Sequence, residues 1–117
     1  MTTIILNYQP YDGTDITWNA LRLAKTLLKN DESVNIFLMN DAVDLARDKT
    51  IKPDSYDHDL VDMLKKMYAE GINLQVCGTC NARCGLLKNQ PYFDASISST
   101  MKILADWVVE SDKVISF

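Results

Sequence analysis

Thr3-Ile4-Ile5-Leu6-Asn7 is a run of apolar and β-branched residues near the start of the chain. A run that is apolar on consecutive positions is typical of a strand covered on both faces, as in a parallel sheet. Between about residues 14 and 30, apolar side chains recur at helical spacing, and residues 34–39 (Val-Asn-Ile-Phe-Leu-Met) indicate a second strand. Strand, helix and strand make a βαβ unit, whose crossover is expected to be right-handed.

The loop after the first strand carries turn residues. Pro10 stops the ladder of strand hydrogen bonds, and Gly13 permits a positive φ. Thr14 or Asp15 is the expected N-cap of the helix that follows. One glycine is no dinucleotide fingerprint, because the G-x-G-x-x-G pattern is absent from the sequence.

Alternation of helices and strands continues to the end of the chain. Asn40-Asp41 is expected to cap a short helix, residues 49–56 form an exposed connection, and an amphipathic helix with acidic residues in its first turn ends at Gly71. Residues 72–76 predict a third strand. Ser96 or Ser98 is the expected cap of a final helix, and residues 112–117 predict a short closing strand. The pattern predicts the α/β class, with residues 1–117 forming a single three-layer α/β/α domain on a mainly parallel sheet of about five strands.

Composition narrows the classes of function. The 117 residues include 12 basic and 16 acidic side chains, and the net charge of −4 disfavours direct nucleic-acid binding. No apolar run approaches the roughly 20 residues that span a bilayer, and no basic segment precedes the first apolar stretch. We therefore expect a cytoplasmic protein, with no membrane partner, whose three cysteines start reduced.

The three cysteines, Cys77, Cys80 and Cys84, cluster directly after the third predicted strand. In open α/β sheets the ligand crevice lies beyond the carboxyl ends of the strands, which is where Cys77 is expected. A helical turn beginning near Thr79 would favour a thiolate at Cys77, and Arg83 would add positive charge. The same thiols could instead be buried apolar side chains.

Other interpretations of this cluster remain open. Cys77-Gly78-Thr79-Cys80 has the C-x-x-C form of dithiol oxidoreductases, although it lies later in the chain than a thioredoxin-type motif does. A zinc or iron–sulfur site needs a fourth ligand, for which His58 is the candidate by type, and a His58-assisted cysteine hydrolase is weaker still. In a third interpretation the chain is a non-catalytic α/β assembly module with incidental thiols. Its subunit interface could use these aromatic residues, each of which could equally belong to the core: Tyr11, Trp18, Tyr92, Phe93 and Trp107.

Four segments together resemble one known family. They are Tyr8–Asp15 around Pro-Tyr-Asp-Gly, Phe37–Val43, Val76–Cys80 with Arg83 and Gly85, and Ser111–Phe117. In order and spacing they are similar to the DsrE/DsrF-like sulfur-relay family, most closely to its YchN-like branch. The resemblance covers nearly the whole chain.

The resemblance implies a function and a site. In the sulfur-relay members, a cysteine at the end of the third strand accepts sulfur as a persulfide and passes it to another protein, and Cys77 matches that cysteine. The YchN-like branch has a counterpart of Cys80, whereas Cys84 falls where relatives commonly carry another residue. The implied partners are sulfur-donor and sulfur-acceptor proteins and further copies of the chain in a trimer or hexamer, with sulfurtransferase-like activity and no cofactor or metal. The expected site-lining residues are Tyr11, Gly13, Asp41, Gly78, Thr79 and Arg83.

Overall fold

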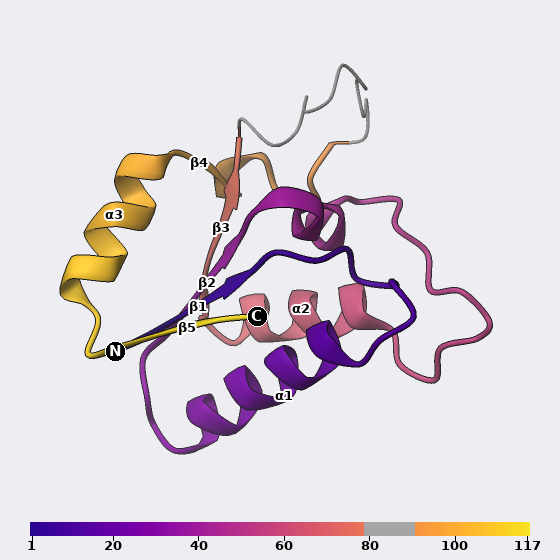
Figure 1. Ribbon diagram of the computed structural model, residues 1–117, viewed down its shortest axis with the longest axis horizontal. Coiled ribbons are helices and arrows are strands. Elements are labelled where there is room, and N and C mark those ends of the chain that lie inside the picture. The colour runs from indigo at the N-terminus through magenta and orange to yellow at the C-terminus, as the bar shows by residue number, and fades with distance from the viewer. Residues whose placement is uncertain (79–90) are drawn as a thin grey trace.

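The described residues build a five-stranded sheet in the order β4-β3-β2-β1-β5, and all neighbouring strands are parallel. A computed structural model describes residues 1–78 and 91–117 (Figure 1). The strands are β1 (Thr2–Leu6), β2 (Val34–Leu38), β3 (Asn73–Cys77), β4 (Ser98–Ser99) and β5 (Lys113–Ser116). The prediction of a mainly parallel α/β sheet is confirmed.

Helices cover both faces of the sheet. The helices α1 (Ile16–Lys29) and α2 (Leu60–Ala69) lie together on one side, and α3 (Met101–Glu110) lies on the other (Figure 1). Among the described residues, the 3₁₀ helix η1 (Asn40–Ala46) follows β2, and the 3₁₀ helix η3 (Ala95–Ile97) precedes β4. This layering follows from right-handed crossovers: two steps in one direction place α1 and α2 on one face, and the return step to β5 places α3 on the opposite face.

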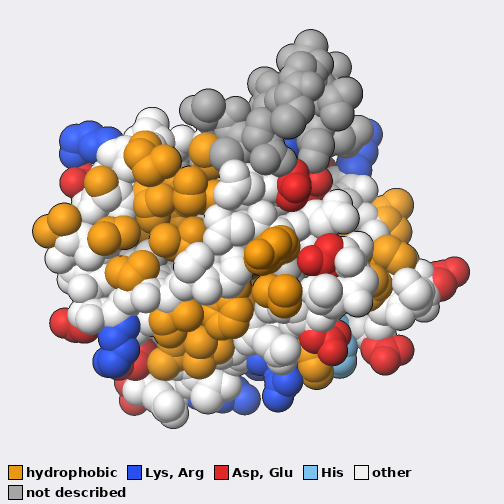
Figure 2. All heavy atoms as spheres, in the orientation of Figure 1, with side chains coloured by type: hydrophobic (Ala, Val, Ile, Leu, Met, Phe, Trp, Pro, Cys, Tyr) orange, Lys and Arg blue, Asp and Glu red, His pale blue; other side chains and the backbone are white. Residues whose placement is uncertain are grey.

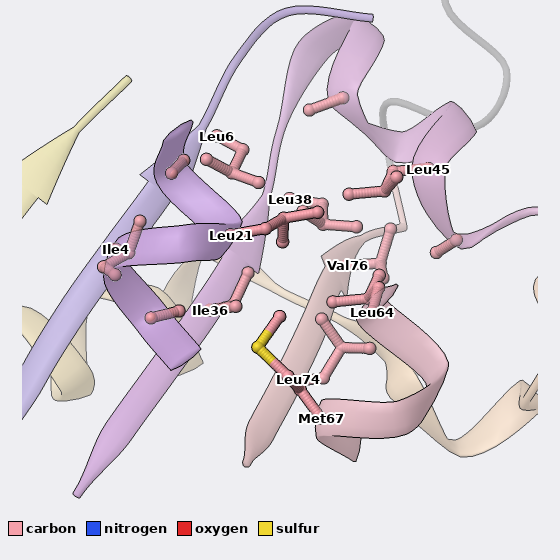
Figure 3. Close-up of a cluster of buried hydrophobic side chains, with 14 of the residues drawn as sticks. Ile4, Leu6, Leu21, Ile36, Leu38, Leu45, Leu64, Met67, Leu74 and Val76 are labelled. Atoms are coloured by element: carbon pink, nitrogen blue, oxygen red, sulfur yellow. The ribbon is translucent and has the colours of Figure 1, made fainter. Parts of the chain in front are cut away.

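The main core lies between the sheet and the pair α1 and α2 (Figure 3). Alternate residues along the strands point into it, which is the period-two pattern that a pleated strand imposes. They meet apolar side chains from the helices, among them these buried residues: Ile4, Leu6, Ile36, Leu38, Leu74 and Val76 from the strands, with Leu21, Leu64 and Met67 from the helices. Because Val76 is anchored in this core, the end of β3 is held in place.

One prediction for the helix ends is confirmed and one is wrong. Asp15 occupies the predicted N-cap position of α1, and beside it the Thr14 hydroxyl accepts from the Ile16 N–H at 3.3 Å. Ser98 belongs to strand β4 rather than to a helix cap, and α3 begins at Met101 with Thr100 in the N-cap position. Serine is favoured at helix caps, but here backbone pairing with β3 uses the same residues, which is a tertiary effect that local propensity does not contain.

Candidate functional site

Cys77 is the last residue of β3, and its side chain is half-buried. Its neighbour across the sheet is β4, with Val76 opposite Ser98 and Cys77 opposite Ser99. Residues that are opposite each other on neighbouring strands project their side chains from the same face of the sheet. Cys77 and Ser99 are therefore adjacent side chains at the carboxyl edge of the sheet, where ligands of open α/β folds bind.

Gly78 allows β3 and β4 to approach closely at this point. Its N–H donates to the Ser99 carbonyl oxygen at 3.0 Å. A Cβ atom at this position would lie 3.1 Å from both Ser98 Oγ and the Ser99 carbonyl oxygen, which is tighter than ordinary contact. The neighbouring strand, and not an unusual φ, favours glycine at this position.

Tyr92 fastens the end of β3 from the other direction. Its hydroxyl donates to the Cys77 carbonyl oxygen at 3.2 Å. Its backbone pairs with Arg47 in an isolated antiparallel bridge, and the Arg47 guanidinium carbon lies 5.5 Å from the centre of the Tyr92 ring. The peptide that carries Cys77 is thus connected to the segment that follows η1.

Arg47 is a buried cation, only 3% exposed. Its Nε donates to Asp44 Oδ1 at 2.6 Å, across three residues of chain. A buried guanidinium requires such a partner, because taking an uncompensated charge out of water is costly. The cluster Asp44, Arg47 and Tyr92 therefore joins two segments of chain, and the Tyr92 hydroxyl ties both of them to the end of β3.

Asp94 fixes the turn that leads into β4. Its side chain accepts from the Ser96 N–H at 2.9 Å and the Ser96 hydroxyl at 2.7 Å, which caps η3. The Tyr68 hydroxyl of α2 also donates to it, at 2.8 Å. The Ser96 hydroxyl, the Ser96 N–H and the Tyr68 hydroxyl lower the pKa of Asp94, because all three favour its charged form. Asp94 thereby connects α2 to η3, the turn that leads directly into β4.

Two of the expected site-lining residues lie in a different place. Gly13 lines a cavity of about 380 Å³ between the loop after β1 and the segment before α2, and Cys77 does not line it. Tyr11 stands beside this cavity, where its hydroxyl accepts from the Leu60 N–H at 3.0 Å and its ring packs edge-on against Tyr56. Burial raises the pKa of Tyr11. Through Tyr56 and Leu60, both residues connect the loop after β1 to the segment before α2 and its first residue.

Of the other predicted residues, one lies beside Cys77, two are exposed elsewhere, and the rest are not described. Asp41 is exposed in the first turn of η1, and Gly78 lies directly beside the cysteine. Thr79, Cys80, Arg83 and Cys84 lie outside the described residues. His58, the candidate fourth metal ligand, is exposed and stacks on Trp18 with ring centres 4.5 Å apart.

The described part of the chain contains neither a cluster of metal ligands nor a membrane-spanning helix. Within residues 1–78 and 91–117, no group of three or more His, Cys, Asp or Glu side chains is arranged to hold a metal ion. Over the same residues, no helix has the length and apolar character needed to cross a membrane.

Sequence reasoning did not place Arg47, Tyr92 and Ser99 near Cys77, and it proposed Tyr92 only as a candidate for a subunit interface. Arg47 and Tyr92 are 45 positions apart, and neither lies in a recognisable motif. Ser99 belongs to a strand of two residues, too short to leave a periodic pattern. The one local signal was Gly78, since glycine within or beside a strand often marks close backbone approach.

Comparisons with known proteins agree with this geometry. The model of the DsrE/DsrF-like family matches residues 1–117. The chain belongs to the DsrE/DsrF-like family. The resemblance seen in the sequence is therefore confirmed at the level of the family, and this family is associated with sulfur relay.

Individual relatives of this DsrE/DsrF-like chain are similar over nearly their whole length. Protein YchN from Escherichia coli is 32% identical over 116 residues, covering 97% of this chain and 96% of YchN. An uncharacterized protein from Methanopyrus kandleri is 35% identical over 115 residues, covering 98% of this chain and 92% of that protein. The crystal structure of the ychN protein from E. coli matches with a TM-score of 0.82 at 29% identity, covering 99% and 97% of the two chains.

Proposed function

We propose that this protein carries sulfur as a persulfide on Cys77, receiving it from a sulfur-donor protein and passing it to a sulfur-acceptor protein. The observation that supports this most directly is the position of Cys77, half-buried at the carboxyl end of β3 in a DsrE/DsrF-like chain. A carrier needs a thiol that a partner can approach and a backbone that holds it still. The contacts of Gly78 and Tyr92 supply the second requirement.

The proposed chemistry is an exchange between sulfur atoms. The Cys77 thiolate attacks the outer sulfur of a donor persulfide, so that a new sulfur–sulfur bond forms on Cys77 while the donor's own sulfur–sulfur bond breaks. The donor's inner sulfur departs as a thiolate and takes up a proton from water. Delivery repeats the same exchange, with an acceptor thiolate attacking the outer sulfur held on Cys77. Neither step needs an external oxidant or reductant.

Mass spectrometry tests the proposal. The chain is incubated with a cysteine desulfurase and cysteine, and a gain of about 32 Da, one sulfur atom, is expected on the peptide containing Cys77. The variants Cys77→Ser, Cys80→Ser and Cys84→Ser are treated in the same way. Loss of the adduct in Cys77→Ser alone supports the proposal. Equal loading of Cys77→Ser and the wild type assigns the sulfur to another cysteine and refutes it.

We also propose that α3 and β5 form the surface through which copies of this chain associate. Against the described part of the chain, α3 buries Leu104 alone, and Val109 is 84% exposed. Hydrophobic side chains gather on this side of the molecule in Figure 2. The large exposed apolar residues of the two elements are Met101, Ile103, Val108, Val109 and Val114. Contiguous exposed apolar surface of this kind marks interaction sites, and we propose that further copies of this chain cover it in the trimer or hexamer implied by the sequence resemblance.

Sedimentation velocity tests the assembly. Wild type is expected to sediment as an oligomer, and Val109→Asp is expected to shift it towards the monomer, because a carboxylate cannot be buried there without a partner. Ile51→Asp is the matched control, since Ile51 is also highly exposed but lies on a different segment. A monomeric wild type, or equal dissociation by both variants, contradicts the proposed surface.

A further inference from the structure

Ser99 carries a buried hydroxyl for which the described part of the chain supplies no hydrogen-bond partner. Its Oγ is buried, and it makes no hydrogen bond in the structure as described. The Ser99 carbonyl, in contrast, accepts from the Gly78 N–H, and the residue stands opposite Cys77. Leaving a buried hydroxyl unsatisfied is costly, so an orphan of this kind calls for an explanation.

The register places the Ser99 side chain next to that of Cys77. The two residues are opposite each other on parallel strands, which lie about 4.8 Å apart, and their side chains project from the same face. Ser99 Oγ makes no hydrogen bond to the Cys77 thiol. A sulfur atom bonded to Cys77 Sγ would extend that side chain by about 2 Å and would bring a sulfur within reach of the hydroxyl.

We propose that Ser99 is the residue that recognises the transferred sulfur: its Oγ–H donates a hydrogen bond to the outer sulfur of a Cys77 persulfide. This inference rests on the proposed function, since it requires sulfur on Cys77. In the exchange described above, the new bond joins Cys77 Sγ to the donor's outer sulfur, and the negative charge of the product persulfide lies mainly on that outer atom. The Ser99 hydroxyl stabilises that charge and leaves the unloaded thiol unaffected.

The neighbouring serine provides a control. Ser98 is exposed and, being one residue earlier in β4, projects from the opposite face of the sheet. Ser98→Ala and Ser99→Ala therefore remove the same hydroxyl from the same two-residue strand, but only the second removes it from the side of Cys77. Removing an unpartnered hydroxyl is not expected to destabilise the fold, so the Ser99→Ala protein should melt at or above the wild-type temperature.

The experiment compares these variants in a Cys80→Ser, Cys84→Ser background, where Cys77 is the sole thiol. Glutathione persulfide is the sulfur donor, and the equilibrium fraction of Cys77 carrying an extra sulfur is measured by mass spectrometry. Ser99→Ala is expected to lower the loading equilibrium about tenfold, the order expected for a lost hydrogen bond to a charged atom, and Ser98→Ala to leave it unchanged. Alkylation of unloaded Cys77 by iodoacetamide, followed against pH, should be the same in all three proteins.

The outcomes separate the two proposals. If the background protein takes up no sulfur on Cys77, the carrier function fails and the role of Ser99 falls with it. If it loads normally and Ser99→Ala loads equally well, the carrier function stands and the role of Ser99 is refuted. A parallel change in the alkylation profile would show that Ser99 acts on the thiol or the fold instead. Ser99→Thr and Ser99→Val repeat the comparison with side chains of equal shape that differ in the hydroxyl, and only the threonine should load fully.

Discussion

Replacing Arg47 by Met tests whether the cluster of Asp44, Arg47 and Tyr92 holds the region of Cys77 together. The substitution keeps the length of the aliphatic stem and removes the guanidinium group. It abolishes a 2.6 Å charge-assisted hydrogen bond to Asp44, whose side chain is only 22% exposed, and the contact with the Tyr92 ring. Breaking a buried ion pair by removing one partner costs about 3–5 kcal/mol, and a partly desolvated cation–π contact about 1 kcal/mol.

Partial exposure of Asp44 and the packing of the methionine stem offset some of this loss. We expect Arg47→Met to lower the free energy of unfolding by about 3 kcal/mol, since a hydrogen bond to a charged group alone contributes about 1.5–3 kcal/mol. For a domain of marginal stability this is a large fraction of the total. Urea unfolding followed by far-UV circular dichroism measures the change, provided that the slope against urea stays constant.

Arg22→Met is the matched control. Arg22 is exposed, its guanidinium carbon lies 4.4 Å from the centre of the Trp18 ring, and it donates to Asn19 at 3.0 Å. Because these contacts of Arg22 are exposed to water, Arg22→Met should lower the free energy of unfolding by less than about 1 kcal/mol. If Arg47→Met costs no more than Arg22→Met, the cluster does not stabilise this part of the fold.

Three further substitutions test the neighbourhood of Cys77. Gly78→Ala places a methyl group 3.1 Å from Ser98 Oγ and the Ser99 carbonyl, so urea unfolding should show a loss of about 1 kcal/mol after the entropic gain of alanine is included, and unchanged stability would mean that β4 shifts freely. Tyr92→Phe removes the hydrogen bond to the Cys77 carbonyl and should cost about 1 kcal/mol in the same assay; a neutral result would show that water replaces the hydroxyl. Asp94→Asn tests the pH dependence: because the native pKa of Asp94 is lowered, its contribution is present above its unfolded pKa of about 3.9 and is lost as pH falls through the native value. The stability difference between wild type and Asp94→Asn should therefore shrink below about pH 4, and a difference that stays constant down to pH 2 would contradict this.

The local pattern of the sequence was sufficient to predict the main helices and strands. Hydrophobic periodicity predicted β1, β2 and α1 to within a residue or two, because their burial is so regular that a single face or a continuous apolar run reveals it. Gly13 and Gly71 do adopt positive φ values, of 88° and 103°, as their places in a turn and after a helix required.

The sequence also placed Cys77 at the end of a strand, and the order of strands and helices placed that strand end at the ligand-binding edge of the sheet. These inferences needed no knowledge of distant contacts, since the side-chain period and the handedness of the crossover are local properties of an L-amino-acid chain. Family resemblance then gave the cysteine its expected role in sulfur transfer.

Only the tertiary structure decided what surrounds that cysteine. Arg47 comes from the end of η1, Tyr92 from a segment 45 positions later and Ser99 from a two-residue strand, and nothing in their local sequence links them to Cys77. Ser98 and Ser99 illustrate the reason: serine favours a helix cap, but pairing with β3 makes these two residues a strand and puts the Ser99 side chain on the same face as Cys77. Such contacts depend on which strands become neighbours, and that choice is made by the packing of the whole sheet and not by any stretch of it.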